Sequence, residues 1–377
     1  MGKLDIVLLL FFVILLSYCQ YPIDSFKQGN KKVLTWIIHM YPPYHNAGAE
    51  WMAHAINKSL IKQGYRVYVF IPKNDIGNTK KIFLELEKGK AIIGKQRQTP
   101  TVYQGVEIYS LNDLNMVRYA IDQSSLLCSH LDFSENTRRL AKRYHKPYLH
   151  ILHNSFEYAK IKRWREDRHP TYLVANSNWI ADVYRDIGYK MHIVYPPTYW
   201  RDYFVKDDKK VWVTLINLCK LKGGELLIRL AKAMPNVQFA GVKGAYNSQI
   251  VDRSVKNITY LDNTPDIKTI YAKTKILIMP STYESWGRTA VEAMSSGIPV
   301  IANNTPGLSE STGKAGIMCD INNFDLWVKH IRRLLSDSKY YKQMSNLARD
   351  RAKALDPHIQ LQALAAWIEK NVIPAKV

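Results

Sequence analysis

Two glutamates of this 377-residue chain, Glu284 and Glu292, lie near the start of an expected helix, Trp286–Ser296, which follows an expected buried strand, Lys275–Pro280. Ligands of open α/β sheets bind beyond the carboxyl ends of the strands, where Glu284 lies. Glu292 comes about 1.4 turns into the helix, so it reaches the same space. A carboxylate accepts two hydroxyl hydrogen bonds, which suits a ribose or a hexose. Two solvated glutamates on a helix face are the alternative.

The loop and helix around Gly287 also suit the binding of a phosphate. Gly287 permits close approach of the backbone, and the helix after it offers free N–H groups and the positive end of its dipole. Lys222 follows another expected strand, Val211–Leu218, and precedes two glycines. Its ammonium group can stabilise negative charge on a leaving diphosphate. A solvated lysine is the alternative.

One histidine is expected to act on a ligand. His153 ends the expected buried strand Pro147–His153 and precedes Asn154-Ser155. We expect it to hydrogen-bond a transferred sugar or a phosphate, and we expect His39, His145 and His150 to be ordinary histidines.

Two successive series of alternating strands and helices position these residues. In the first, a strand within Lys31–Met40, a helix at Ala49–Gln63 and a strand at Arg66–Pro72 imply a right-handed crossover and a parallel sheet. We therefore predict an α/β fold with two Rossmann-like, doubly wound domains facing a central cleft. The predicted parts are an N-terminal hydrophobic segment (1–21), a first domain (31–197), a linker (198–210), a second domain (211–355) and a C-terminal helical segment (356–377).

Composition and charge restrict the class of protein. Hydrophobic residues make up 47% of the chain and charged residues 23%, which excludes a disordered or collagen-like chain. The length suits two domains. The 53 Lys and Arg residues against 32 Asp and Glu residues give a net charge of +21, which favours anionic partners such as nucleic acid, acidic lipid headgroups or phosphorylated ligands.

The apolar run Ile6–Leu16 predicts a location for the protein. A helix of this length spans about 16 Å, against a hydrocarbon core of about 30 Å, and counting Leu4–Tyr21 as one segment brings it close to a membrane span. Lys27, Lys31 and Lys32 follow the run, and the positive-inside rule then places the catalytic domains in the cytoplasm, associated with the membrane through the N-terminus. A cleaved signal peptide and a secretory location are the alternative.

Several motifs of common enzyme classes are absent from the sequence. It contains no GxGxxG after the first strand, no P-loop, no GxSxG and no HExxH. Its four cysteines are too far apart to form a CxxC pair, and no His/Cys cluster has zinc spacing. These absences exclude the common dinucleotide oxidoreductases, ATPases, hydrolases and metalloproteases.

The stretch that begins at Glu284 resembles the E-x7-E motif of retaining family 4 glycosyltransferases (glycosyl transferases group 1), which have the GT-B fold. Glu284 and Glu292 match its spacing, and the continuation Ala293–Ile301 is similar to the family's "EAMA-x-G-x-PVV". The resemblance covers about Val33–Ser311. In the second domain, Thr305–Glu310 matches the family's Gly-rich turn ending in glutamate, and Lys222–Gly224 matches its "KG" motif. In the first domain, Asn46–Glu50 resembles the "GGAE" loop. His153 matches the active-site histidine, and Asn176-Ser177 the "NS" pair.

This resemblance implies a retaining glycosyltransferase that moves a sugar from a nucleotide-diphosphate donor, bound mainly by the second domain, to an acceptor bound mainly by the first. It implies no cofactor and no metal, because Lys222 and helix N-termini replace a cation at the diphosphate. His153, Glu284 and Lys222 are then the expected catalytic residues. Glu284 contacts the sugar, and the expected donor-binding set is Gly48 (through its backbone, at the phosphate), Asn217, Lys222, Gly287, Arg288, Glu292 (at the ribose) and Glu310.

Two positions depart from the family pattern. Ile216 stands where the family usually has an arginine that clamps the diphosphate, so Lys220 or Arg288 is expected to supply the second positive charge. Ala47 replaces the first glycine of the "GG" pair. The expected partners are the nucleotide sugar, a glycan, lipid or protein acceptor, and a membrane surface.

Two other functions remain open from the sequence. A basic nucleic-acid-binding protein fits the net charge, but no RNP, KH or zinc signature accompanies it, so nucleic acid is not the expected partner. A GT-B hydrolase or epimerase acting on a nucleotide sugar is the second alternative.

Overall fold

The computed structural model describes residues 32–45, 47–72, 76–89, 99–206, 210–244 and 248–373. The chain divides into two units, Met1–Lys32 and Val33–Val377, and the following description concerns the second. The expected hydrophobic segment 1–21 lies outside the described residues. Within the described ranges, none of the helices combines the length and the apolar character that crossing a bilayer requires.

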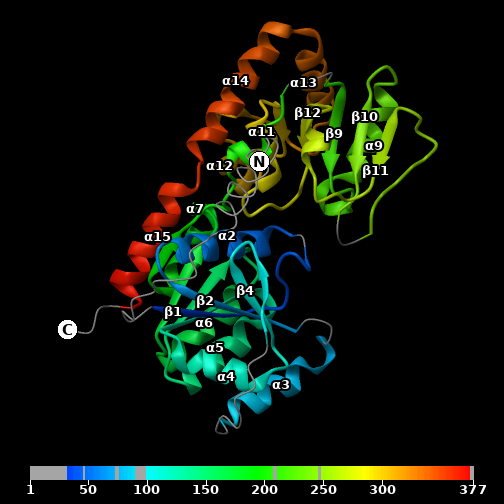
Figure 1. Ribbon diagram of the computed structural model, residues 1–377. Helices are drawn as coiled ribbons and strands as arrows, with labels where there is room; N and C mark the ends of the chain where they lie inside the picture. The colour runs from blue at the N-terminus through cyan, green and yellow to red at the C-terminus, as the bar shows by residue number, and fades with distance from the viewer. Residues whose placement is uncertain are drawn as a thin grey trace, which may run out of the picture. The chain divides into compact units, whose positions relative to one another are not determined.

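The first domain is built on an eight-stranded sheet with the order β3-β4-β2-β1-β5-β6-β7-β8 (Figure 1). Only the pairing of β3 with β4 is antiparallel. The strands are β1 (Val33–Ile37), β2 (Arg66–Ile71), β3 (Thr101–Tyr103), β4 (Val106–Ser110), β5 (Leu126–His130), β6 (Tyr148–Leu152), β7 (Thr171–Ala175) and β8 (Met191–Ile193).

Helices cover both faces of this sheet, so its central strands are apolar on both sides. Alternate residues of β1 enter two different cores: Ile37 packs in one apolar cluster, and Leu34 and Trp36 in the other. The covering α-helices are α2 (Gly48–Lys62), α3 (Thr79–Glu87), α4 (Leu114–Gln123), α5 (Ser134–Arg143), α6 (Tyr158–Arg163) and α7 (Asn178–Tyr184); 3-10 turns are η1 (Ile76–Asn78), η2 (Leu131–Phe133), η3 (Trp164–Asp167) and η4 (Arg185–Ile187).

The second domain contains a six-stranded, wholly parallel sheet with the order β11-β10-β9-β12-β13-β14. Its strands are β9 (Trp212–Ile216), β10 (Phe239–Val242), β11 (Ile258–Leu261), β12 (Thr274–Met279), β13 (Val300–Ala302) and β14 (Gly316–Met318). Its helices are α8 (Trp200–Tyr203), η5 (Lys220–Lys222), α9 (Gly224–Ala233), α10 (Lys268–Tyr271), α11 (Arg288–Ser295), α12 (Pro306–Thr312), η6 (Gly313–Ala315), α13 (Phe324–Ser336) and α14 (Ser338–Ala354). The prediction of two Rossmann-like, doubly wound domains is confirmed.

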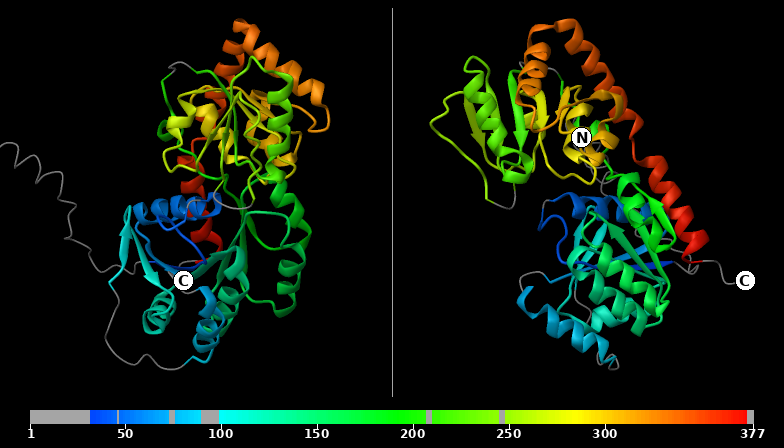
Figure 2. Two further views of the ribbon diagram at one scale, coloured as in Figure 1. Left: turned by 90° about the vertical axis from the view of Figure 1, so that its right-hand side faces the viewer. Right: turned by 180° about the vertical axis from the view of Figure 1, so that it is seen from behind.

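The C-terminal helix α15 (His358–Asn371) packs on the first domain, although it follows the second in sequence (Figures 1 and 2). Leu361, Leu364 and Ile368 recur at helical spacing and belong to the same apolar cluster as Trp36 of β1. The hydroxyl of Tyr65 donates to Glu369 at 3.0 Å. The chain therefore crosses between the domains twice, once between β8 and α8 and once between α14 and α15.

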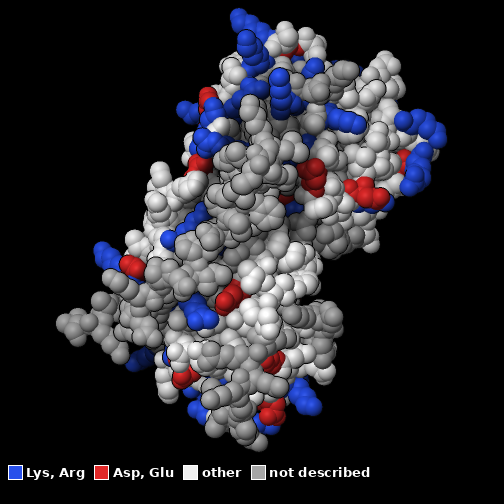
Figure 3. All heavy atoms as spheres, in the orientation of Figure 1, with Lys and Arg blue, Asp and Glu red and all other residues white. Residues whose placement is uncertain are grey.

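The excess positive charge is gathered unevenly on the surface. Figure 3 shows Lys and Arg side chains grouped over α13 and α14 with few acidic neighbours. The exposed basic residues of these two helices include Lys329, Arg332, Arg333, Lys339 and Lys342. One group of exposed basic side chains thus lies on α13 and α14.

Two glycines allow the loop between β12 and α11 to approach α12 closely. Gly287 has a φ of +103°, which L side chains rarely adopt, and a Cβ there would lie 2.6 Å from Leu308 Cδ2. A Cβ on Gly307 would lie only 2.2 Å from the carbonyl oxygen of Glu284. Backbone packs against backbone here, so the Glu284 loop has one permitted position.

We predict that Gly307→Ala destabilises the protein by about 1–3 kcal/mol, because the new methyl group overlaps a backbone oxygen that cannot move alone. Gly48→Ala is the matched control, since a Cβ there meets nothing within 4 Å. Thermal unfolding of both variants measures the difference. Equal melting temperatures for Gly307→Ala and wild type would show that the loop is not held by this contact.

Candidate functional site

The strand order of the second sheet brings Lys222 and Glu284 together. Strand β9 is flanked by β10 on one side and β12 on the other, so the connections after β9 and β12 diverge and leave a crevice at the carboxyl edge. Lys222 ends η5 in the first connection, and Glu284 lies in the second. Lys222 Nζ donates to Glu284 Oε1 at 2.5 Å, and Ser281 Oγ donates to the same oxygen at 2.9 Å.

This pair retains hydrogen-bonding capacity for a ligand. The side chains of Lys222 and Glu284 are 24% and 16% exposed. The ammonium has two further N–H donors. Glu284 Oε2 has no hydrogen-bond partner among the residues that the structure describes. A positive charge and a free carboxylate oxygen thus lie side by side, which suits a phosphate next to a hydroxyl-bearing sugar.

A second ion pair lies on α11. Arg288 Nε and Glu292 Oε1 are 2.9 Å apart, and Tyr271 donates its hydroxyl to Glu292 Oε2 at 3.0 Å. Arg288 also donates to the hydroxyl of Tyr203 at 2.6 Å. Burial raises the pKa of Glu292 although Arg288 opposes it, and burial with the nearby Glu292 raises the pKa of Tyr271 well above its ordinary value. Tyr271 therefore stays protonated and orients the carboxylate.

A cavity of about 500 Å³ joins this ion pair to the first domain. Arg288 and Glu292 line it from α11, and Gly48 lines it from the start of α2. The N-cap of α2, Ala47, makes no side-chain capping bond, and a Cβ on Gly48 would meet only open space. The backbone N–H groups at the N-terminus of α2 thus face the cavity, where they can donate hydrogen bonds to an anion.

His153 lies just beyond the end of β6, close to a second histidine. Its Nε2 is 2.8 Å from Nδ1 of His130, the last residue of β5. Burial, with a smaller effect of the nearby His150, lowers the pKa of His153 from 6.5 to about 3. His153 is therefore a neutral hydrogen-bonding group at physiological pH, not a cation.

Asn176 connects His153 to the Glu284 loop. Its amide donates to the carbonyl oxygen of His153 at 3.3 Å and to Ser285 Oγ at 2.9 Å. Ser155 N donates to the hydroxyl of Tyr283 at 2.9 Å across the same interface. The loop that carries Glu284 is thus bonded to the strand end that carries His153.

Two residues expected at the donor have other contacts. Glu310 accepts hydrogen bonds from the backbone N–H groups of Asn178 and Trp179 at 2.8 and 3.0 Å, so it caps α7 of the first domain. Asn217 has a φ of +70°, and its Oδ1 accepts from Cys219 N and from Gln249, which fixes the turn after β9. Gly287 is a packing glycine at the start of α11.

The sequence did not identify the tyrosines at Arg288 and Glu292. Tyr203 lies in the expected linker and Tyr271 at the end of α10, and neither belongs to a motif. In a chain with 24 tyrosines, residue type alone gave no signal for these two. The sequence could have identified Asn176 and Ser281 as site residues, because Asn176 belongs to the "NS" pair and Ser281 lies three residues before Glu284.

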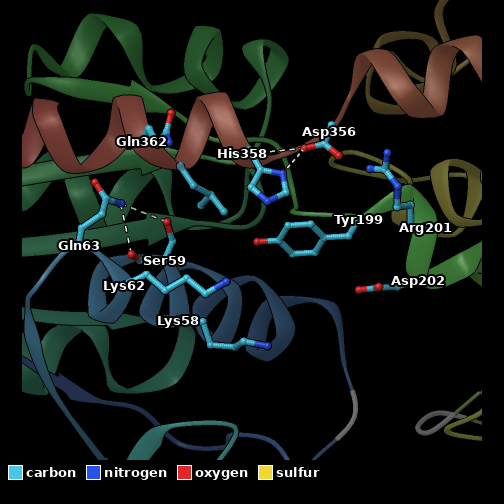
Figure 4. Close-up of a pocket in the computed structure, with 11 residues that line it drawn as sticks. Lys58, Ser59, Lys62, Gln63, Tyr199, Arg201, Asp202, Asp356, His358 and Gln362 are labelled. Carbon is cyan, nitrogen blue, oxygen red and sulfur yellow. Dashed lines mark hydrogen bonds and ion pairs between the residues drawn. The ribbon is translucent and has the colours of Figure 1, made fainter. Parts of the chain in front are cut away.

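A second cavity, also of about 500 Å³, adjoins the first (Figure 4). Lys58, Tyr199 and Asp202 line both cavities. Figure 4 shows Lys58 and Lys62 extending from α2 below Tyr199 and His358. Its cationic side chains are Lys58, Lys62 and Arg201, and its acidic ones are Asp202 and Asp356, the latter bonded to His358 at 2.5 Å.

This architecture defines the class of fold as GT-B, with two Rossmann-like domains and polar residues at the carboxyl edges of both sheets. The chain is similar over most of its length to the Anabaena protein HepE, solved with UDP and glucose: the TM-score is 0.67 at 17% identity, over 89% of this chain and 98% of that one. A glycosyltransferase from Rickettsia africae gives a TM-score of 0.66 at 15% identity, over 92% and 100% of the two chains.

The second domain carries a family match. Residues 199–351 match the family model for glycosyl transferases group 1. The O-antigen chain mannosyltransferase B of Escherichia coli is 36% identical over 96 residues, which are 24% of this chain and 25% of that protein. The D-inositol 3-phosphate glycosyltransferase of Paenarthrobacter aurescens is 33% identical over 92 residues, 24% of this chain and 22% of that protein.

Each of these two alignments thus spans about a quarter of the relative's length. The family model matches residues 199–351, which is less than half of the chain.

We predict that His153 makes folding stability depend on pH. The unfolded chain binds a proton near pH 6.5, whereas folded His153 does so only near pH 3. Its contribution is therefore complete above about pH 6.5 and falls as the pH drops below that value. His153→Gln should lose less stability than wild type between pH 7 and pH 5, as urea unfolding measures.

His145→Gln is the control for this comparison, because His145 is exposed. It should follow the wild-type pH dependence. Parallel curves for His153→Gln and wild type would contradict the assignment of a neutral, buried imidazole.

Proposed function

We propose that this protein is a retaining, family 4 glycosyltransferase that moves a sugar from a nucleotide-diphosphate donor to an acceptor without a metal ion. The single observation that carries the proposal is the Lys222–Glu284 pair at the switch point of the second sheet. It places a cation for the diphosphate next to a carboxylate oxygen for the sugar. The cavity that Gly48 and Glu292 line adds a phosphate-binding helix start and a carboxylate for the ribose.

The donor binds mainly through the second domain in this proposal. Both oxygens of Glu292 already have one partner each, and a carboxylate has about four acceptor positions, so two ribose hydroxyls still find acceptors. Lys222 and the N–H groups at the start of α2 bind the diphosphate. Arg288 is held by Glu292 and Tyr203, and it supplies the second positive charge where the family arginine is replaced by Ile216.

The transfer step breaks the bond between the anomeric carbon and the diphosphate and forms one from the same face to an acceptor oxygen. The acceptor proton passes to the departing phosphate oxygen. Lys222 stabilises the charge that develops on this group, which is the part of the reaction where fixed charge acts most strongly. His153 is neutral, so it orients the sugar or phosphate through its free Nδ1 and does not transfer charge to it.

The second cavity favours an acceptor with an anionic group. Lys58 and Lys62 lie one turn apart on α2, and Arg201 faces the same space. Burial, and then the charge of Lys62, lowers the pKa of Lys58, so a bound anion would relieve the repulsion between these lysines. A glycan, lipid or protein acceptor that carries a phosphate or carboxylate meets this condition.

We predict three different effects of substitutions at the donor site. Glu292→Gln should weaken nucleotide-sugar binding about tenfold or more, because charge-assisted hydrogen bonds are worth about 1.5–3 kcal/mol. Lys222→Ala should lower turnover more than ground-state binding, since charge grows as the sugar leaves. Glu284→Ala should weaken the nucleotide sugar and spare the bare nucleotide diphosphate. Calorimetry and kinetics with a panel of UDP-, GDP- and ADP-sugars measure all three.

Lys232→Ala is a matched control in the same domain. Lys232 is exposed on α9 and pairs with Asp252 at 3.0 Å, so its loss should leave binding and turnover unchanged. Near-wild-type behaviour of all three donor-site variants, in correctly folded protein, would remove the main support for the proposed transfer.

Sugar transfer should persist in EDTA without added Mg²⁺ or Mn²⁺. The chain has no Asp-x-Asp sequence to hold a divalent ion against the diphosphate, and in this proposal the Lys222 ammonium balances the diphosphate charge instead. Turnover measured before and after chelation tests this. Complete loss in EDTA, with recovery on addition of manganese or magnesium, would show that a metal binds the diphosphate.

A further inference from the structure

Three polar side chains meet at the carboxyl edge of the first sheet. His39 follows β1, His130 ends β5, and Glu50 lies in the first turn of α2. Strand β1 is flanked by β2 and β5, so this is the switch point of the first sheet, as the Lys222–Glu284 pair marks that of the second. One potential metal-ligand atom from each of the three residues lies within 4.8 Å of the others.

These side chains are buried and lack the partners that buried polar groups need. The side chain of Glu50 is 3% exposed, that of His39 is 14% exposed, and His130 is completely buried. Glu50 Oε2, His130 Nε2 and His39 Nδ1 have no hydrogen-bond partner among the described residues. The nearest approach, His39 Nε2 to Glu50 Oε1, is 3.7 Å, longer than a hydrogen bond.

Burial of an unpaired carboxylate and two unsatisfied imidazoles is unfavourable unless a shared partner binds them. A cation that accepts lone pairs from the carboxylate and both imidazoles gives each of these buried groups a partner, which removes this unfavourable free energy. Solvated polar side chains on a surface would not need such a partner.

We propose that His39, Glu50 and His130 bind one transition-metal ion, with Zn²⁺ as the best match. Two imidazoles and one carboxylate form a known zinc ligand set, whereas Mg²⁺ and Ca²⁺ prefer oxygen ligands. Zinc bonds of about 2.0–2.2 Å in tetrahedral geometry place ligand atoms about 3.4 Å apart. The ligand atoms, which lie within 4.8 Å of one another, must therefore move closer by up to about 1.4 Å when the ion binds.

The contact between His130 and His153 orients His130 for this role. Metal-binding histidines donate their second ring N–H to a neighbouring acceptor, which fixes the tautomer. His130 Nδ1 lies 2.8 Å from His153 Nε2. If Nδ1 donates this bond, the lone pair of Nε2 faces Glu50 and His39. The same tautomer leaves His153 with a proton on Nδ1, ready to donate to a ligand.

The inference is independent of the proposed sugar transfer. The three ligands belong to the first domain, and Lys222 remains the cation at the diphosphate. EDTA removes an ion from this site as well, so the test measures binding directly and not through activity.

The test uses the full chain, treated with EDTA and desalted. Titration with ZnCl₂ in a calorimeter should show one ion bound per chain, and the melting temperature should rise with Zn²⁺ by mass action. Co²⁺ should give the visible absorption of a four-coordinate ion. Absence of stoichiometric Zn²⁺ uptake by the wild-type chain, or a purely six-coordinate Co²⁺ spectrum, would overturn the proposal.

Substitutions locate the bound ion. His39→Gln, Glu50→Gln and His130→Gln should each weaken Zn²⁺ binding at least tenfold. His358→Gln is the matched control, since His358 forms an exposed pair with Asp356 at 2.5 Å, and it should keep wild-type affinity. Unchanged binding in the three variants, or loss in His358→Gln, would place the ion elsewhere and contradict the proposal. The wild-type Co²⁺ spectrum decides the question even if a variant fails to fold.

Discussion

The ion pair between Lys222 and Glu284 is the contact on which the arrangement of the second domain's carboxyl edge depends. It joins the connection after β9 to the connection after β12, across the point where the strand order reverses. A partly buried charge that loses its partner is costly, so each side chain holds the other in place. Gly307 and Gly287 add the steric constraint, because they let the Glu284 loop lie directly against α12. Charge and close packing therefore select the same loop conformation.

The two domains are connected by polar contacts that reach this same loop. Asn176 bonds to Ser285, Ser155 bonds to Tyr283, and Glu310 caps α7. The Glu310 contact is a carboxylate at a helix N-terminus, where free N–H groups and the helix dipole favour negative charge. Through this contact Glu310, in the second domain, binds the first domain. The contact of Glu310 with α7 therefore both caps a helix and joins the two domains.

The fold followed from local sequence patterns, and the site followed only in part. Apolar runs within Lys31–Met40 and Lys275–Pro280 indicated two strands, which the structure contains as β1 and β12. Lys222 and Glu284 were predictable because topology brings the ends of adjacent strands together. The contacts of Glu310 with α7 and of the two tyrosines with α11 depend on tertiary packing between segments far apart in sequence. The same holds for His39, which was expected to be ordinary and lies beside Glu50 and His130.

The charged side chains at the carboxyl edge of the second sheet are paired with one another and keep free hydrogen-bonding positions. Glu292 is held by Arg288 and Tyr271, and Lys222 by Glu284, so each of these two charged side chains has an oppositely charged partner. Each of these side chains can still form hydrogen bonds: Lys222 through two N–H groups, Glu284 through Oε2, and Glu292 through its remaining lone pairs. A ligand can then add hydrogen bonds without first breaking those that position the side chains. Because the protein has already ordered these groups during folding, little of the binding free energy is lost in arranging them.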